Sequence, residues 1–114
     1  PITRGILVSV YAGINPLKLE GRSNNIDLIR AIYQEYYKNE KFVTVTNQPP
    51  TTKQTLGTNQ CLIYPTIDTR NNRLIVIACI DNLVKGAAGQ AVQNANILFG
   101  FPEETGLEEL ALYP

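Results

Sequence analysis

The stretch 73–80, Arg-Leu-Ile-Val-Ile-Ala-Cys-Ile, decides the fold of this chain. Every residue after Arg73 is apolar, and several are β-branched, which favours a strand. A strand with one solvated face alternates polar and apolar residues, and this stretch does not alternate. It therefore predicts a central strand of a sheet, with both faces covered.

Further strands are predicted on the N-terminal side of this stretch. Residues 61–68 form its hairpin partner, because the connection 69–72 contains two Asn residues and Asn tolerates the positive φ of a hairpin turn. Residues 4–14 are apolar and β-branched and predict a first strand, and 42–46 predict a short alternating strand. Residues 53–57 are expected to be extended, followed by a bend at Gly57 and Thr58.

Two helices complete the pattern. Residues 24–37 carry an apolar stripe at helical spacing, and Ser23, Asn24 or Asn25 can cap its start after a polar loop at 18–23. Residues 86–99 predict a second helix, which Gly100 can close and Pro102 ends. The acidic tail 103–114 is expected to cover an edge. The order β-α-β-β-β-α predicts a single α+β domain over 1–114, with both helices packed on a largely antiparallel or mixed sheet.

Composition narrows the classes of function. The chain has 114 residues, 44% of them apolar, and ten basic residues balance ten acidic ones. There is no positive field to attract nucleic acid, and no apolar run reaches the roughly 20 residues of a membrane helix. A cytoplasmic protein with neither kind of partner is expected. His is absent, and Cys61 and Cys79 lie in apolar surroundings that favour buried, unreactive thiols.

The segment 81–91, DNLVKGAAGQA, departs from core patterning. Two glycines at a helix start cost about 1 kcal/mol each relative to Ala, which is tolerated where something must approach the backbone closely. Three interpretations remain: tight helix–sheet packing; a ligand site with Lys85 and Gln90, whose free helix-start amides would favour an anion or carbonyl group; and an RNA clamp, because residues 86–89 fit a GXXG pattern.

A resemblance to a known family ranks these interpretations. The segment 81–94, DNLVKGAAGQAVQN, resembles the C-terminal signature of the N-acetyl-gamma-glutamyl-phosphate reductases, and 96–103 resembles its continuation. Residues 1–6, PITRGI, resemble the family's strand opening, and 57–61, GTNQC, match its middle. The resemblance covers essentially the whole chain and corresponds to roughly the last third of the full protein.

The resemblance implies a fold like the C-terminal domain of glyceraldehyde-phosphate-dehydrogenase-like enzymes. It also implies an NADP-dependent homo-oligomer, a dimer or tetramer, that reduces an acyl phosphate to a semialdehyde in arginine biosynthesis. The family's dinucleotide loop, its catalytic Cys in a Gly-Cys-Tyr-Pro-Thr motif and its His motif would precede Pro1. We therefore expect this chain alone to be inactive, and Cys61, which lies in a predicted strand, not to replace the nucleophile.

The same resemblance suggests site residues. The cofactor side would be formed by the turn into the last helix, where the nicotinamide carboxamide would meet Gln90; its residues are Lys85, Gly86, Ala87, Gly89 and Gln90. Gln90 could also be a solvated helix residue. Lys85 could face the cofactor phosphate or be an ordinary surface lysine. Arg4 could hold a substrate carboxylate or phosphate, or form a structural ion pair, and Asn59 is a further substrate-side candidate. A non-enzymatic small-molecule-binding or regulatory α+β domain remains the alternative.

Overall fold

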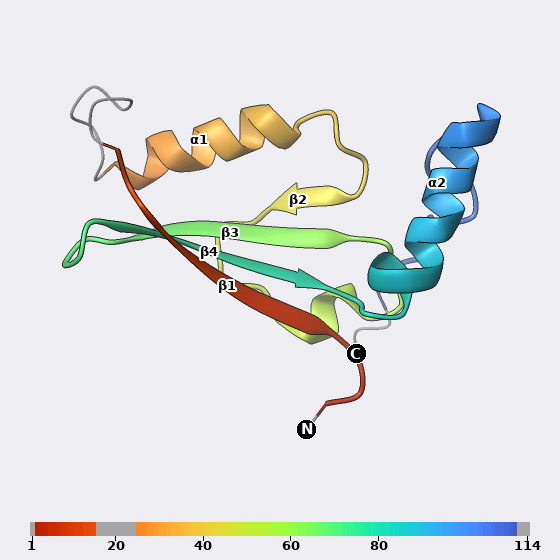
Figure 1. The fold of residues 1–114 in the computed structure, drawn as a ribbon, viewed down its shortest axis with the longest axis horizontal. Coiled ribbons are helices and arrows are strands. Elements are labelled where there is room, and N and C mark those ends of the chain that lie inside the picture. The colour runs from red at the N-terminus through yellow and green to blue at the C-terminus, as the bar shows by residue number, and fades with distance from the viewer. Residues whose placement is uncertain (1, 16–24, 112–114) are drawn as a thin grey trace.

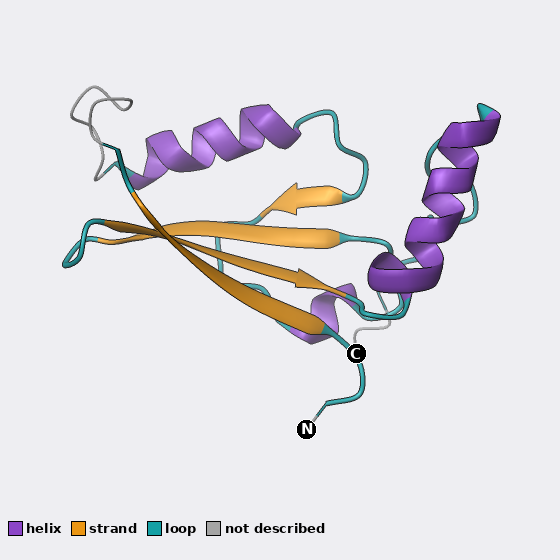
Figure 2. Cartoon of the chain, in the orientation of Figure 1, coloured by secondary structure: helices purple, strands orange, loops and turns teal. Residues whose placement is uncertain are grey.

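The computed structural model describes residues 2–15 and 25–111 of the chain. Within these ranges the helices and strands follow one another as predicted, and the class is α+β (Figures 1 and 2). The elements in chain order are β1 (Ile6–Gly13), α1 (Ile26–Tyr37), β2 (Val43–Val45), a 3-10 turn η1 (Thr52–Thr55), β3 (Cys61–Asp68), β4 (Arg73–Ile80), a π-helical turn η2 (Val84–Ala88) and α2 (Gly89–Phe99).

The four strands form one mixed sheet in the order β1-β4-β3-β2. Strand β4 is antiparallel to both β1 and β3, and β2 runs parallel to β3. The hairpin between β3 and β4 contains Asn72 at φ 50°, which confirms the expected use of Asn in this turn. The central position of β4 in the sheet is therefore confirmed.

Helix α1 packs against β2 and β3 and covers that end of the sheet (Figure 1). Asn25 caps it by accepting a hydrogen bond of 3.0 Å from the Leu28 amide to its side chain. Ile29 is the residue of the predicted stripe that becomes buried. The alternative caps Ser23 and Asn24, and the loop 18–23, lie outside the described residues.

Two local predictions were wrong. The segment expected to be extended forms η1, because the Gln54 side chain accepts a hydrogen bond from the Thr51 amide and closes the turn. Helix α2 does not pack on the sheet; it projects beyond the end of the strands and contacts the turn η2 (Figure 1). Its C-terminus does close as expected, with Gly100 at φ 73°. Neither α1 nor α2 is long or apolar enough to span a membrane.

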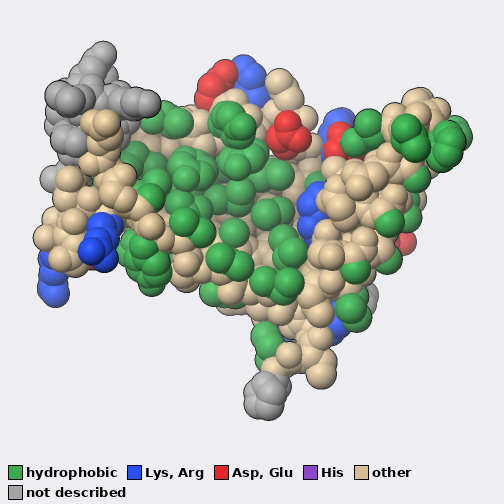
Figure 3. Space-filling model, viewed as in Figure 1, with side chains coloured by type: hydrophobic (Ala, Val, Ile, Leu, Met, Phe, Trp, Pro, Cys, Tyr) green, Lys and Arg blue, Asp and Glu red, His purple; other side chains and the backbone are tan. Residues whose placement is uncertain are grey.

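Coverage of the sheet also differs from expectation. Within the described residues, Cys79 is the only buried side chain of β4, and all eight residues of β1 are exposed. Large apolar side chains of β1 therefore remain in solvent, and Figure 3 shows hydrophobic side chains gathered over the sheet. A strand can be central in its hydrogen bonding while its faces stay open, because sheet pairing and face packing are separate interactions. The sheet thus offers, at β1, an apolar surface that the described residues leave open.

Candidate functional site

The carboxylate of Asp81 lies at the base of the turn that leaves β4. It is fully buried and accepts hydrogen bonds from the main-chain amides of Gly57 at 2.7 Å, Leu83 at 2.8 Å and Val84 at 3.2 Å. The Arg4 guanidinium adds two further bonds, from Nε at 3.3 Å and from Nη2 at 2.5 Å. One side chain therefore joins the N-terminal segment, the bend at Gly57 and the start of η2.

These contacts decide the ionisation of Asp81. Burial alone would raise its pKa, but the bonds from Arg4 and the three amides outweigh burial and lower the pKa to about 2. The carboxylate is therefore charged at neutral pH and paired with Arg4. Of the two interpretations of Arg4, the placement favours the structural ion pair.

The main-chain amides around the start of the turn η2 already have hydrogen-bond acceptors. Besides the two amides bonded to Asp81, the amide of Gly86 donates to the Asp81 carbonyl at 2.9 Å and that of Ala88 to the Leu83 carbonyl at 3.1 Å. The Gly89 amide donates to the Val84 carbonyl. The expectation that free helix-start amides attract an anion is therefore wrong for these five donors, because the chain's own carboxylate and carbonyls occupy them.

The outer surface of this turn is open and nearly without side chains. Gly86, Ala87 and Ala88 are exposed, whereas Gly89 is buried. A Cβ built on Gly89 would lie 2.5 Å from Asn59 Oδ1 and 2.8 Å from the Val84 carbonyl oxygen, so no side chain fits there. Tight packing therefore explains Gly89 but not Gly86. A GXXG clamp needs both glycines on an exposed loop, and these residues are helical with the second one buried.

Gln90 begins the exposed face of α2. It is half-buried, and its Nε2 donates to Asn94 Oδ1 one turn along the helix at 3.0 Å. The bond is solvent-exposed, so the amide can exchange it for another partner. Gln90 thus lies next to the open surface of Gly86 to Ala88.

Lys85 faces inward, whereas a ligand of the cofactor phosphate would have to point outward. Its Nζ donates to Gln93 Oε1 at 2.7 Å and lies 5.4 Å from the centre of the Phe42 ring. Burial lowers the pKa of Lys85, while nearby acidic groups oppose this shift. Asn59 is also turned inward: it is 1% exposed and donates to the same Gln93 oxygen at 2.8 Å. In this conformation Asn59 is placed beneath the turn and not on its surface.

Cys61 lies at the start of β3 and is half-buried. Burial raises the pKa of its thiol, against a smaller lowering effect of Lys85. A raised pKa disfavours the thiolate that a nucleophile needs. These surroundings fit the expectation that Cys61 is not the reactive cysteine.

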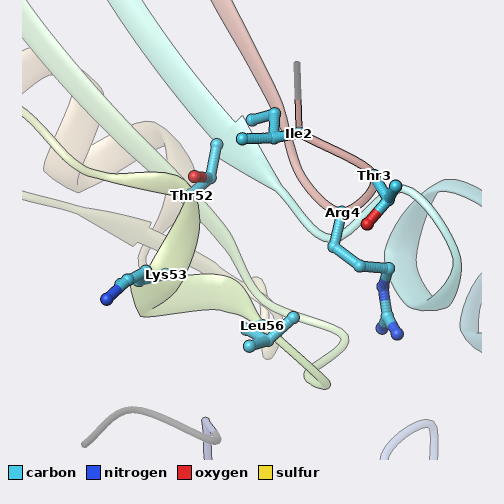
Figure 4. Close-up of a pocket in the computed structure, with 6 residues that line it drawn as sticks. All are labelled: Ile2, Thr3, Arg4, Thr52, Lys53 and Leu56. Carbon is cyan, nitrogen blue, oxygen red and sulfur yellow. The ribbon is translucent and has the colours of Figure 1, made fainter.

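A shallow hollow of about 410 Å³ lies between the N-terminal segment and η1. Its two cations are Arg4 and Lys53, and Figure 4 shows their side chains pointing in different directions, without a common focus. Arg4 is also committed to Asp81. The hollow therefore does not by itself form an anion site.

Comparison with known proteins decides the family. Residues 1–82 match the family model described as "Semialdehyde dehydrogenase, dimerisation domain". The chain belongs to this family. The match spans the whole sheet of the dimerisation domain and ends at the start of the turn that carries Gly86 and Gln90.

Curated relatives extend the likeness to the residues that follow position 82. Proteins named N-acetyl-gamma-glutamyl-phosphate reductase match all of this chain, with 52% identity in Dehalococcoides mccartyi, 47% in Geobacter metallireducens and 45% in Heliobacterium modesticaldum. The chain spans 32% of the length of each of these relatives. The predicted family resemblance is confirmed.

The structure brings the seven predicted residues around one turn. Three of them, Lys85, Gly86 and Ala87, lie in η2 and two, Gly89 and Gln90, begin α2. Arg4 and Asn59 lie beneath the turn. Asp81 and Gln93 were not predicted, although both hold the turn in place. An Asp directly after a strand and before a Gly-rich turn is a signal for side-chain capping of the amides that follow. Gln93 carries no such signal, because its partners lie 34 positions earlier, at Asn59, and 10 later, at Glu103.

Proposed function

We propose that this chain is the C-terminal part of an NADP-dependent N-acetyl-gamma-glutamyl-phosphate reductase, which reduces the acyl phosphate to N-acetylglutamate semialdehyde in arginine biosynthesis. The observation that carries the proposal is the match of the entire chain to proteins of that name at 45–52% identity. The catalytic thiolate and the dinucleotide loop would belong to the part of the relatives' length that this chain does not span.

The turn from Lys85 to Gln90 is the part of this chain that would meet the cofactor. Gly86, Ala87 and Ala88 expose main chain with no side chain larger than a methyl group, which fits the close approach of a flat ring. Bound NADPH would supply a hydride. The Gln90 amide, which can both donate and accept, would orient the ring carboxamide from the edge of this surface.

Other predicted residues would act indirectly. Lys85 is held by Gln93 and Phe42, so its charge would contribute at a distance and not as a phosphate ligand. The pair of Arg4 and Asp81 would hold the base of the turn, and Arg4 also lines the hollow beside η1. Substrate contact by Arg4 or Asn59 stays a prediction.

The test uses a full-length protein that contains this chain, with NADPH and the acyl phosphate as substrates. We expect reductase turnover, and we expect Gln90→Ala to weaken NADPH binding about tenfold, as for the loss of one or two hydrogen bonds. Asn94→Ala is the control, because it removes Gln90's present partner on the same exposed helix face. If Gln90→Ala leaves both the cofactor dissociation constant and the kinetics unchanged, Gln90 has no cofactor role.

We also propose that the full protein is a homo-oligomer that buries the apolar surface of this sheet. Leu7 and Val8 are 49% and 46% exposed on β1, and adjacent strand residues point to opposite faces. The double variant Leu7→Glu/Val8→Glu therefore places a charge on each face. Sedimentation velocity should show monomers for this variant, whereas Tyr36→Glu on exposed α1 should leave the oligomer intact. An unchanged oligomer in the double variant would place the interface elsewhere.

A further inference from the structure

Beneath the turn η2, four polar side chains form a chain of hydrogen bonds whose donors and acceptors can be assigned in only one way. The four are Lys85, Gln93, Asn59 and Glu103. Gln93 Nε2 donates to Glu103 Oε1 at 2.5 Å, and Gln93 Oε1 accepts from Lys85 Nζ at 2.7 Å. A carboxylate can only accept and an ammonium can only donate, so the two charges decide which end of the Gln93 amide faces which partner.

The direction of the Gln93 amide then dictates that of Asn59. Since Gln93 presents its oxygen, Asn59 must present Nδ2, and the two atoms lie 2.8 Å apart. Asn59 Oδ1 is left facing Gly89, and within the described residues it has no hydrogen-bond partner. Gln93 and Asn59 are 8% and 1% exposed, so water does not easily replace these bonds. Asn59 Oδ1 and the Val84 carbonyl together leave no room for a side chain at position 89.

The same bonds hold the two ends of η2. Lys85, at its second residue, is drawn to Gln93, and Gly89, where α2 begins, rests against Asn59. With Lys85 anchored inward, its long side chain does not cover the exposed main chain of Gly86 to Ala88. The shape and openness of that surface therefore depend on Gln93, which does not itself lie on it.

We propose that Gln93 is a positioning residue, which keeps the Gly86–Ala88 surface open and rigid by holding Lys85 and Asn59 beneath it. The inference rests on the proposed function only for the identity of what binds on this surface. Gln93 would shape this surface from below and would not contact substrate or cofactor.

Three variants of a full-length protein that contains this chain test the proposal. Gln93→Met keeps the length of the side chain but removes both the acceptor and the donor. The double variant Gln93→Glu/Glu103→Gln restores both, because a carboxylate at 93 accepts from Lys85 and Asn59 while an amide at 103 donates. Ile29→Ala, in the buried face of α1, is a control that destabilises the protein away from the turn.

The first measurement is hydrogen exchange of the Gly86, Ala88 and Gly89 amides without cofactor. Gln93→Met should accelerate it about tenfold, as expected when the hydrogen bonds beneath the turn are lost, and the double variant should stay near the parent rate. Ile29→Ala should leave these three amides unchanged. An unchanged rate in Gln93→Met, or a double variant that behaves like Gln93→Met, would overturn the proposal.

The second measurement is NADPH affinity together with kinetics. Gln93→Met should raise the dissociation constant and KM for NADPH about tenfold while kcat at saturation changes less, and the double variant should recover both. Faster exchange with unchanged NADPH affinity would support the positioning role and count instead against the cofactor function proposed for the turn. The two proposals can therefore fail separately.

Discussion

Asp81→Asn should lower the free energy of unfolding around β4 by about 3 kcal/mol at neutral pH, because the fully buried side chain loses its charge and leaves main-chain amides and Arg4 without their acceptor. The amide keeps one acceptor oxygen where the carboxylate had two. It also turns an NH₂ group toward donors that include the Gly57 amide, at 2.7 Å from the present Oδ2. Arg4 loses its charged partner at the same time.

The same carboxylate makes stability depend on pH. Its pKa in the folded protein is about 2, below the usual 3.8, so its contribution is fully present above about pH 4. The contribution, about 2 kcal/mol for a shift of this size, is lost as pH falls from 4 toward 2. The Asp81→Asn variant should lack this part of the acid sensitivity.

Hydrogen exchange of the Cys79 amide region at pH 2.5 to 7 measures both effects, because it reports the opening free energy locally. Asp68→Asn is the matched control: it makes the same chemical change at the hairpin, where the carboxylate bonds to Asn71 and to the Arg70 amide in exposed surroundings. Its effect should be much smaller. Equal effects at the two positions would contradict the central role of Asp81.

Gly89→Ala should be the second most damaging change and should cost about 2 kcal/mol, within the range for overpacking. The new Cβ would lie 2.5 Å from Asn59 Oδ1, 2.7 Å from Val84 Cγ1 and 2.8 Å from the Val84 carbonyl oxygen. The last of these is main chain and cannot move without opening η2. The higher helix propensity of Ala recovers at most about 1 kcal/mol.

Gly86→Ala is the matched variant for Gly89→Ala. It adds the same methyl group at an exposed position, so it separates an effect on packing from an effect on ligand binding. A Cβ at Gly86 would meet no atom closer than 3.5 Å, so thermal stability should stay the same or rise slightly. If a cofactor ring rests on this surface, the added methyl group should still weaken NADPH binding. A loss of stability in Gly86→Ala as large as that in Gly89→Ala would contradict the geometry of the turn.

Features governed by neighbours in the chain were predictable from the sequence alone. The run 73–80, its hairpin partner and the Asn72 turn depend on local runs of apolar and β-branched residues and on local φ preference, and the structure has them as expected. The cap at Asn25 and the closing Gly100 follow from the chemistry of helix ends. The family, too, could be read from the residues of 81–94.

What the tertiary structure decided depends on residues that meet only after folding. Arg4 reaches Asp81 across 77 positions, and Asn59 reaches Gln93 across 34. The helix start that was expected to be free is a π-helical turn whose main-chain amides already have acceptors. Lys85 points inward, Gly89 packs against Asn59, and α2 lies beyond the end of the sheet. No local pattern carries this information, because a buried amide or carboxylate takes its partners from whatever the fold brings within about 3 Å.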